Sequence, residues 1–193
     1  MVMNTWKDIQ YMVKELLINL MLMVDPSHAA EPNHHTPVDN LEATKREIVL
    51  REQTQCLAEN VYFEARNQPL AGQFAVMSVT INRVNDDRYP NTICEVVKQG
   101  PHRPSWKGTG EMIPVRHRCQ FSWYCDGKSD KIFQQKTFDK IYEMSYSILS
   151  GEFKVVDITE GATHYHADYV SPSWAATKTK TIEIEDHIFY RWD

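Results

Sequence analysis

Residues 56–84 read CLAENVYFEARNQPLAGQFAVMSVTINRV, and this stretch decides how the rest of the chain is organised. Apolar residues recur at helical spacing on both sides of Pro69, which predicts two consecutive helices. The residue before a proline is disfavoured in α geometry, so the first helix, expected over about residues 43–66, ends before Pro69. The second helix begins at Pro69 and is apolar nearly all round, which is typical of a central buried helix.

Glu64 follows the apolar and aromatic run Val61–Phe63, close to the expected end of the first helix. The last turn of a helix carries partial negative charge, and burial also disfavours an ionised carboxyl, so both effects raise the pKa of Glu64. A raised pKa suits a general acid near neutral pH, as cleavage of a glycosidic bond requires. The alternative is a structural carboxylate. Arg66 faces away on a helix, whereas Arg83 stays open as an ionic partner.

The composition is that of a globular protein with no obvious polyanionic partner. The chain has 193 residues, of which 42% are hydrophobic and 24% charged, enough for one domain plus an appendage. Its formal net charge is −5, without a long run of one sign. We therefore expect no nucleic-acid binding, and no stable membrane span is expected because the apolar run near the N-terminus is too short. The partner has to be inferred from the site.

Three regions are expected along the chain. Residues 1–24 form either an N-terminal amphipathic helix or a signal-like segment, because the apolar run Leu16–Val24 is too short to span a bilayer and small residues follow it. Residues 25–40 are rich in Pro, His and Asn without a hydrophobic period, which predicts a linker. Residues 41–193 remain as the domain proper.

A third helix is expected after the central one. Thr92 and Glu95 form a capping box at its start, and Gly100 predicts its end. Residues 101–118 are polar and contain Gly and Pro, so we expect a long surface loop there.

The last part of the chain changes from helix to strand. Another helix is expected over about residues 136–149, ending at Gly151. Residues 177–192 read TKTKTIEIEDHIFYRW, and this alternating, β-branched pattern predicts strand. Helices followed by a small late β element indicate an α+β fold.

The four cysteines are Cys56, Cys94, Cys119 and Cys125, and they lack the paired CxxC spacing of a structural zinc site. They are either free and buried or form two disulfides, for which three connectivities exist. Pairing of Cys94 with Cys119 or Cys125 is favoured, because such a crosslink would restrain the long loop.

Two motifs carry groups that suit an N-acetylated sugar. CQFSWY contains Gln120, Phe121 and Ser122, and THYHADY contains Tyr165 and His166. Amide, hydroxyl and aromatic groups supply the hydrogen bonds and ring faces that such sugars need. These five residues are the candidate substrate-binding groups, with ordinary core packing as the alternative for Phe121.

His164 and His166 also invite a test for metal binding. Alternate residues of a strand point to one face, so both could ligate zinc if His117, Cys119 or Asp168 supplied a third ligand. No third ligand is dictated by the sequence. The favoured interpretation has no metal and no cofactor, with His166 as a hydrogen-bonding group of a groove.

Five blocks occur in order over residues 56–192: the opening stretch of residues 56–84, then YPNTICEVV, CQFSWYCDG, GATHYHADYVSPSWA and HIFYRW. This order resembles the bacterial and phage cell wall hydrolases of the spore cortex-lytic (SleB/CwlJ) type. The resemblance implies a mostly helical, lysozyme/lytic-transglycosylase-like catalytic domain over residues 41–193. It also implies peptidoglycan glycan strands as the substrate and Glu64 as the catalytic acid. The family commonly has Gly-Glu where this chain has Asn67-Gln68.

A glycosidase ordinarily uses two carboxylates, and no second acid is well placed near Glu64 in the sequence. The resemblance to transglycosylases implies that Glu64 protonates the leaving oxygen and then deprotonates the 6-hydroxyl of the sugar, giving an anhydro product. Hydrolysis by water is the close competitor. The other hypotheses are a non-catalytic peptidoglycan-binding domain and a metal-dependent amidase or peptidase using the two histidines. We expect a monomer in an extracytoplasmic setting (periplasm or cell wall) or a phage-associated one.

Overall fold

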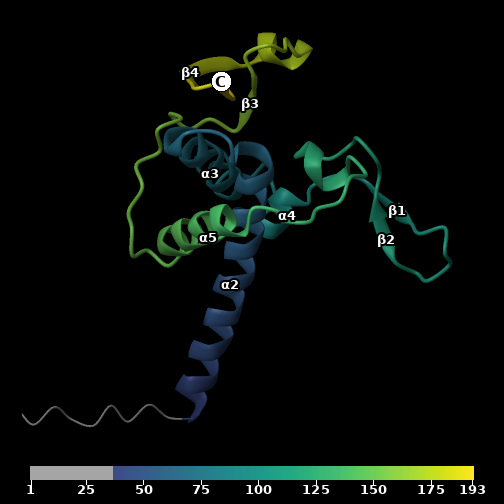
Figure 1. The fold of residues 1–193 in the computed structure, drawn as a ribbon, viewed down its shortest axis with the longest axis vertical. Coiled ribbons are helices and arrows are strands. Elements are labelled where there is room, and N and C mark those ends of the chain that lie inside the picture. The colour runs from purple at the N-terminus through teal and green to yellow at the C-terminus, as the bar shows by residue number, and fades with distance from the viewer. Residues whose placement is uncertain (1–36) are drawn as a thin grey trace, which may run out of the picture. The chain divides into compact units, whose positions relative to one another are not determined.

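The computed structural model describes residues 37–193, so the predicted segment 1–24 and residues 25–36 of the predicted linker lie outside the described part. Residues 44–193 form one compact unit. Figure 1 shows the elements of the described chain, and η here denotes a 3-10 helix. In chain order they are α2 (Pro37–Ala65), α3 (Leu70–Val84), α4 (Ile93–Val97), β1 (His102–Pro104), β2 (Met112–Pro114), η2 (Ser122–Cys125), α5 (Gln135–Leu149), β3 (His164–Ala167), η3 (Ser173–Thr177), β4 (Thr179–Ile184) and β5 (His187–Arg191).

The two helices of the opening stretch are confirmed. α2 ends at Ala65, and α3 follows with Pro69 at its N-cap and most of its length buried, as predicted for the central helix. α2 starts at Pro37 rather than near Ala43, inside the stretch predicted as linker. A proline suits the first position of a helix, and Asp39 in the first turn complements the helix dipole.

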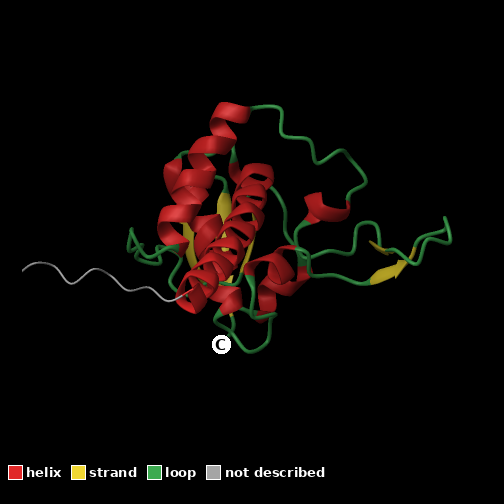
Figure 2. Ribbon diagram, turned by 90° about the horizontal axis from the view of Figure 1, so that it is seen from below, coloured by secondary structure: helices red, strands yellow, loops and turns green. Residues whose placement is uncertain are grey.

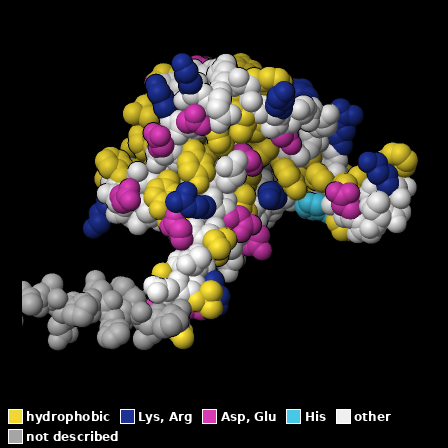
Figure 3. All heavy atoms as spheres, turned by 60° about the horizontal axis from the view of Figure 1, so that its bottom comes forward, with side chains coloured by type: hydrophobic (Ala, Val, Ile, Leu, Met, Phe, Trp, Pro, Cys, Tyr) yellow, Lys and Arg dark blue, Asp and Glu magenta, His cyan; other side chains and the backbone are white. Residues whose placement is uncertain are grey.

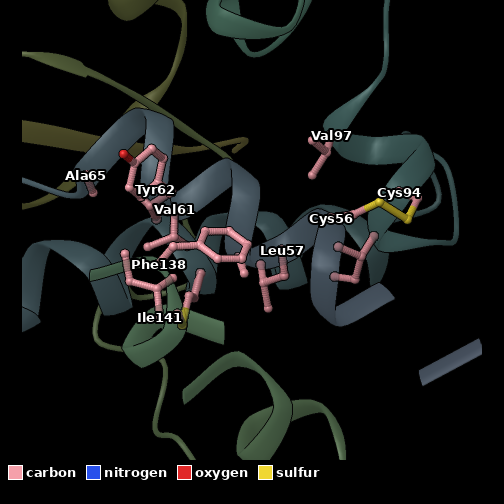
Figure 4. Packing of buried hydrophobic residues seen from close by; sticks show 13 residues of the cluster. Cys56, Leu57, Val61, Tyr62, Ala65, Cys94, Val97, Phe138 and Ile141 are labelled. Atoms are coloured by element: carbon pink, nitrogen blue, oxygen red, sulfur yellow. A yellow bond between two sulfur atoms is a disulfide. The ribbon is translucent and has the colours of Figure 1, made fainter. Parts of the chain in front are cut away.

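The main hydrophobic core lies where the second half of α2 meets α3, α4 and α5. Leu57, Val61 and Ile141 are almost completely buried there, and Figure 4 shows them with their neighbours. Tyr62 packs edge-on against Phe138 with 5.9 Å between ring centroids. The end of α2, which carries Glu64, is therefore fixed by packing rather than by helix propensity alone.

The third helix starts as predicted but ends earlier. The Thr92 side chain accepts a hydrogen bond from the backbone N–H of Glu95, and α4 ends at Val97 rather than at Gly100. A Cβ at Gly100 would lie 3.0 Å from the Cα of Cys119, so this glycine allows two segments to approach closely. The prediction of Gly100 as the helix terminator was therefore wrong, and the glycine instead permits this close approach.

The stretch 101–118 is not a structureless loop, which corrects the prediction. β1 and β2 pair antiparallel within it, with His102 opposite Pro114. Gly108 and Gly110 adopt positive φ angles of 67° and 75° between the two strands. In Figures 1 and 2 this hairpin projects away from the helices. Neither face is buried in a core, so its sequence lacks the alternation by which strands are predicted.

The late β element is confirmed as a three-stranded antiparallel sheet in the order β3-β5-β4. Tyr165 of β3 lies opposite Phe189 of β5. Phe189 and Ala162 form a second core cluster with Ala75 and Val79 of α3, so the sheet packs on the central helix, and Figure 2 shows its strands behind the helices. This packing determines which β3 side chains face α2 and α3.

Figure 3 shows acidic and basic side chains interspersed on one face of the molecule, in keeping with the small net charge. Within residues 37–193, no helix combines the length and apolarity needed to cross a bilayer.

The cysteines form two disulfides, Cys56–Cys94 and Cys119–Cys125, so the predicted pairing of Cys94 with either later cysteine was wrong. Cys56 on α2 and Cys94 on α4 are both buried in the main core, as Figure 4 shows. Cys119 and Cys125 instead close the short turn that contains η2. Cys94 pairs with Cys56 because α4 packs against α2.

Removing the Cys56–Cys94 crosslink should destabilise the fold more than removing the Cys119–Cys125 crosslink. The first closes a separation of 38 residues and the second one of 6, which correspond to chain-entropy contributions of about 4 and about 2 kcal/mol. The double variants Cys56→Ser/Cys94→Ser and Cys119→Ser/Cys125→Ser are compared by urea unfolding. Equal losses of unfolding free energy would contradict this ranking.

Candidate active site

Glu64 lies in the last turn of α2, between the fully packed residues Val61 and Ala65, and its own side chain is partly exposed. Desolvation is the main cause that raises the pKa of its carboxyl, as the sequence predicted. A hydrogen bond from Tyr165 and the positive charge of Arg83 act in the opposite direction. The net pKa shift is upward, which favours a protonated carboxyl at this helix end.

Tyr165 donates its phenolic hydrogen to Oε2 of Glu64 at 2.8 Å. The tyrosine comes from β3, and its ring packs against Phe189 and His187 at centroid distances of 5.6 and 5.1 Å. Burial, followed by the nearby Glu64 carboxyl, raises the pKa of Tyr165 well above its usual value. The phenol therefore stays neutral and remains a hydrogen-bond donor to Glu64 whichever protonation state the carboxyl adopts.

Arg83 is the charged group that influences Glu64 most. It comes from α3, is 4% exposed and donates from Nε to the backbone carbonyl of Thr163 at 2.7 Å. Its guanidinium lies 4.8 Å from the ring centroid of Phe121, and its Nη1 is buried without a hydrogen-bond partner. Among residues 37–193 no ion pair within 4.0 Å joins Arg83 to Glu64. The guanidinium acts on the carboxyl through space rather than as a direct salt-bridge partner.

Arg66 does not pair with Glu64 either. Its guanidinium lies 5.0 Å from the ring centroid of Tyr62 and donates to the carbonyl of the same residue. The structural alternative of a tightly paired Glu64 carboxylate thus lacks its two candidate partners within the described chain.

A buried polar network lies under the end of α2. Asn60 donates to Oγ1 of Thr80 at 3.1 Å and accepts a hydrogen bond from Nε1 of Trp123 at 2.9 Å. The Trp123 ring stacks on Phe63 with 4.6 Å between centroids. Because buried amides must be satisfied, this network fixes Trp123 beside the α2 turn that carries Glu64.

The candidate residues of the CQFSWY motif divide into buried and exposed ones. Phe121 is 2% exposed and packs under Arg83, so its ring belongs to the interior, as the core-packing alternative held. Gln120 and Ser122, on either side of it, are exposed. Phe121 therefore contacts Arg83, which in turn acts on Glu64. A substrate-binding role for Gln120 and Ser122 stays a prediction.

His166 lies on the other side of β3 from Tyr165. Its ring stacks on Tyr190 and its Nε2 is 3.0 Å from the Tyr190 hydroxyl, while Nδ1 is 2.9 Å from the carbonyl of Ala167. The structure therefore does not bring His166 to Glu64, because successive strand residues point to opposite faces. Its proposed part in substrate binding stays a prediction, and any such part would be away from Glu64.

The two histidines of β3 share a face, as predicted, and both lie against Trp174 at 5.3 and 5.6 Å. Burial, followed by the positive charge of Arg83, lowers the pKa of His164 to about 4. Cys119 is bonded to another cysteine, so it cannot act as the third ligand that a metal would need. Within residues 37–193 no group of three His, Cys, Asp or Glu side chains is arranged to hold a metal ion.

Two pockets lie along α2. One, of about 510 Å³, is lined mainly by apolar residues such as Val49, Leu50 and Ile93. The other, of about 250 Å³, is lined by Phe63 and Trp123 among others, and Phe63 directly precedes Glu64 in the sequence. Glu64 lines neither pocket, and its side chain is partly exposed.

A model of the cell wall hydrolase family matches residues 67–190. The chain belongs to this family. The match covers Arg83, the Gln120–Ser122 segment and Tyr165, and it begins just beyond Glu64. The family that the five sequence blocks indicated is thereby confirmed.

The chain is also similar to parts of three known proteins. Over 41 residues the chain is 44% identical to the spore cortex-lytic enzyme of Bacillus subtilis (strain 168), a segment that is 21% of this chain and 13% of that protein. The catalytic domain of the Bacillus cereus SleB protein is 25% identical, with 72% of this chain and 89% of that one covered and a TM-score of 0.48. The catalytic domain of the germination-specific lytic transglycosylase SleB from Bacillus anthracis is 23% identical, with coverages of 83% and 99% and a TM-score of 0.50. This last similarity is one of fold, and the predicted α+β class is confirmed.

Two features of the site escaped sequence reasoning. The proximity of Tyr165 to Glu64 has no local signal, because the two residues are far apart in the chain. The polar network of Asn60 with Thr80 and Trp123 was missed as well. Its only sequence signal was a buried asparagine one helical turn before Glu64, which had to find a partner somewhere.

Replacing Tyr165 by Phe should raise the pKa of Glu64 further. The Tyr165 hydrogen bond favours the ionised carboxylate, so its loss leaves desolvation less opposed. The pKa is measured by NMR titration of the side-chain carboxyl carbon of Glu64. Tyr190→Phe is the matched control, since it removes a hydroxyl that contacts His166 instead. An unchanged or lowered pKa in Tyr165→Phe would show that the hydrogen bond does not control this carboxyl.

Replacing Glu64 by Gln should stabilise the protein at neutral pH and have little effect in acid. The pKa of Glu64 is higher in the folded than in the unfolded state, so folding is favoured most when the carboxyl is protonated in both states. As pH rises above about 4, the unfolded wild type gains from releasing its proton, and stability falls until the folded carboxyl also ionises. A glutamine does not ionise, so the Glu64→Gln protein does not lose stability in this way as pH rises.

The measurement is the unfolding free energy of both proteins from about pH 4 to about pH 8. Glu59→Gln controls for the removal of one negative charge from the same helix. If the Glu64→Gln and wild-type curves ran parallel over this range, Glu64 would not be the destabilising buried acid described here.

Proposed function

We propose that this chain cleaves the glycan strand of peptidoglycan and that Glu64 supplies the proton to the leaving oxygen. Membership of the cell wall hydrolase family supports the substrate class. The observation that carries the residue assignment is the raised pKa of a partly exposed carboxyl at a helix end, with a neutral tyrosine donating to it. Protonation of a glycosidic oxygen near neutral pH needs an acid of this kind.

The proposed reaction uses Glu64 twice. Its proton moves to the glycosidic oxygen as the bond from that oxygen to the anomeric carbon breaks, leaving an oxocarbenium-like sugar and a Glu64 carboxylate. Tyr165 and Arg83 then stabilise the carboxylate through a hydrogen bond and a positive charge. The carboxylate accepts the proton of the sugar's own 6-hydroxyl as that oxygen bonds to the anomeric carbon, giving an anhydro product and restoring the acid.

The surroundings of Glu64 support a single-acid mechanism. A retaining glycosidase places its second carboxyl about 5 Å from the first, where each would perturb the pKa of the other. Within the described chain the charged group that perturbs Glu64 is the Arg83 guanidinium, and no second carboxyl has that effect. Water activated by the Glu64 carboxylate would give a reducing end instead, so the product distinguishes the two courses.

We also propose an extracytoplasmic setting. All four cysteines are in disulfides, which persist in oxidising compartments outside the cytoplasm. Peptidoglycan lies in the same setting, so the enzyme and its proposed substrate would meet there.

Replacing Glu64 by Gln should abolish the release of glycan fragments from purified sacculi while the fold persists. Loss of the general acid should lower the rate by about a hundredfold to ten-thousandfold. Fragments are quantified and identified by mass spectrometry, with 1,6-anhydro ends expected in the wild-type digest. Glu59→Gln, on the same helix, is the control that should retain activity.

Undiminished digestion by Glu64→Gln would overturn the assignment of the acid. A wild-type protein that binds sacculi without releasing any soluble fragment would overturn the proposed activity and favour a binding domain.

A further inference from the structure

A pocket of about 250 Å³ lies at the C-terminal end of α2, and the proposed reaction at Glu64 does not use it. Part of its lining is aromatic, and the rest carries charged side chains of both signs. We call it the charged pocket; its principal lining residues are Phe63, Arg66, Trp123, Asp130, Lys131 and Phe133.

The charged pocket is held open by contacts that do not involve a ligand. Phe63 and Trp123 stack at 4.6 Å between centroids, and Asn60 holds the Trp123 indole by a 2.9 Å hydrogen bond. The Tyr62 hydroxyl, also in the lining, accepts hydrogen bonds from the backbone N–H groups of Phe133 and the following residue, at 3.2 and 3.0 Å. The loop after η2 is thereby fixed to α2, so the pocket is preformed.

The cations of the pocket are available to a ligand. Arg66 and Lys131 have no carboxylate within 4.0 Å among residues 37–193. Each instead lies over an aromatic ring, that of Tyr62 at 5.0 Å and that of Phe133 at 5.7 Å. Lys128 pairs with Asp126 at 3.6 Å, but the lysine side chain is 84% exposed, and such surface pairs contribute little.

Asp130 in the pocket lies close to other carboxylates. Partial burial raises the pKa of Asp130, and the carboxylates of Asp126 and Glu59 raise it further. A carboxyl surrounded by like charges is stabilised when a cationic group approaches it. The lining therefore contains basic groups that suit an anion and acidic groups that suit a cation.

The pocket and Glu64 share the last two turns of α2. Phe63 precedes Glu64 on α2, and Trp123 follows Ser122 at the start of η2. Successive residues of a helix point about 100° apart, so Glu64 and Phe63 face neighbouring regions of the surface. A polymer whose backbone lies at Glu64 could thus carry a side branch into the charged pocket.

The residues that line the charged pocket indicate which kind of chemical group could bind there. A neutral sugar needs a ring face and hydrogen bonds, and it would leave the charges of both signs unused. A ligand of one sign would be repelled by half of the lining. The volume is below that of a pocket for a drug-sized molecule, roughly 300–1,000 Å³, so it suits one residue of a larger ligand. A small zwitterionic group with an aliphatic stem fits all three properties.

We propose that the charged pocket binds the peptide stem of peptidoglycan, with Arg66 and Lys131 on a stem carboxylate and Asp126 and Asp130 on the free amine of its diamino acid. The Phe63–Trp123 pair contacts the aliphatic part. This inference rests on the proposed function, because it takes the glycan strand at Glu64 as given. It makes the enzyme selective for strands that still carry their peptides.

The first test compares cleavage of peptide-bearing glycan strands with cleavage of the same strands stripped by an amidase. Wild type should cut the peptide-bearing strands faster, and the ratio of the two rates should fall about fivefold in Arg66→Gln and in Lys131→Gln. Asp130→Asn should lower the ratio on free-amine stems but not on stems acetylated at that amine. Lys136→Gln and Lys140→Gln, exposed on α5 outside the pocket, are matched controls whose ratio should equal that of wild type. A wild-type ratio of one would overturn the proposal.

The second test does not require cleavage. A free stem tripeptide containing the diamino acid is titrated into the full-length Glu64→Gln protein, and NMR shifts of the Trp123 indole N–H are followed. Saturable shifts that weaken about fivefold in Lys131→Gln and stay unchanged in Lys136→Gln are expected. Absence of binding up to millimolar peptide would overturn the proposal even if glycan cleavage were intact. Binding without any glycan cleavage by the wild type would instead refute the proposed function and leave the pocket assignment supported.

Discussion

The hydrogen bond from Tyr165 to Glu64 joins two parts of the chain that are 101 residues apart, and the arrangement of the site depends on it. Glu64 is placed by the packing of the end of α2, whereas Tyr165 is placed by the sheet. The antiparallel pairing of β3 with β5, and the packing of that sheet on α3, determine that the Tyr165 side chain points toward α2. Arg83 strengthens the same junction, because its Nε bonds to the carbonyl of Thr163 just before the strand begins.

The chemistry of Glu64 results from forces of opposite sign acting on one carboxyl. Desolvation favours the protonated form, while the Tyr165 hydroxyl and the Arg83 charge favour the ionised form. An acid that gives up a proton and takes it back needs both states to be accessible, and this balance provides that. A partly buried acid also lowers the stability of the fold at neutral pH. The core around Leu57 and the Cys56–Cys94 disulfide stabilise the same helix, α2, and offset this loss of folding stability.

The end of α2 serves two neighbouring surfaces at once. Glu64 faces the junction with β3, and Phe63 faces the charged pocket, where Trp123 covers it. Asn60, one turn earlier, connects the two by holding Trp123 from below and bonding to Thr80 of the central helix. Because these side chains share one rigid helix end, a branch bound in the pocket would position the attached strand relative to Glu64.

Local patterns in the sequence determined the break at Pro69, the buried α3, the Thr92 cap and the late strands, because each depends on residues near one another in the chain. The upward pKa shift of Glu64 could also be predicted, since its helix-end position and apolar neighbours are local facts. Only the tertiary structure decided that Tyr165 faces Glu64 while His166 points away, that Phe121 is interior, and that Cys94 bonds to Cys56. These outcomes depend on how the sheet and α4 pack against the helices, and contacts between distant segments leave no periodic signal in the sequence.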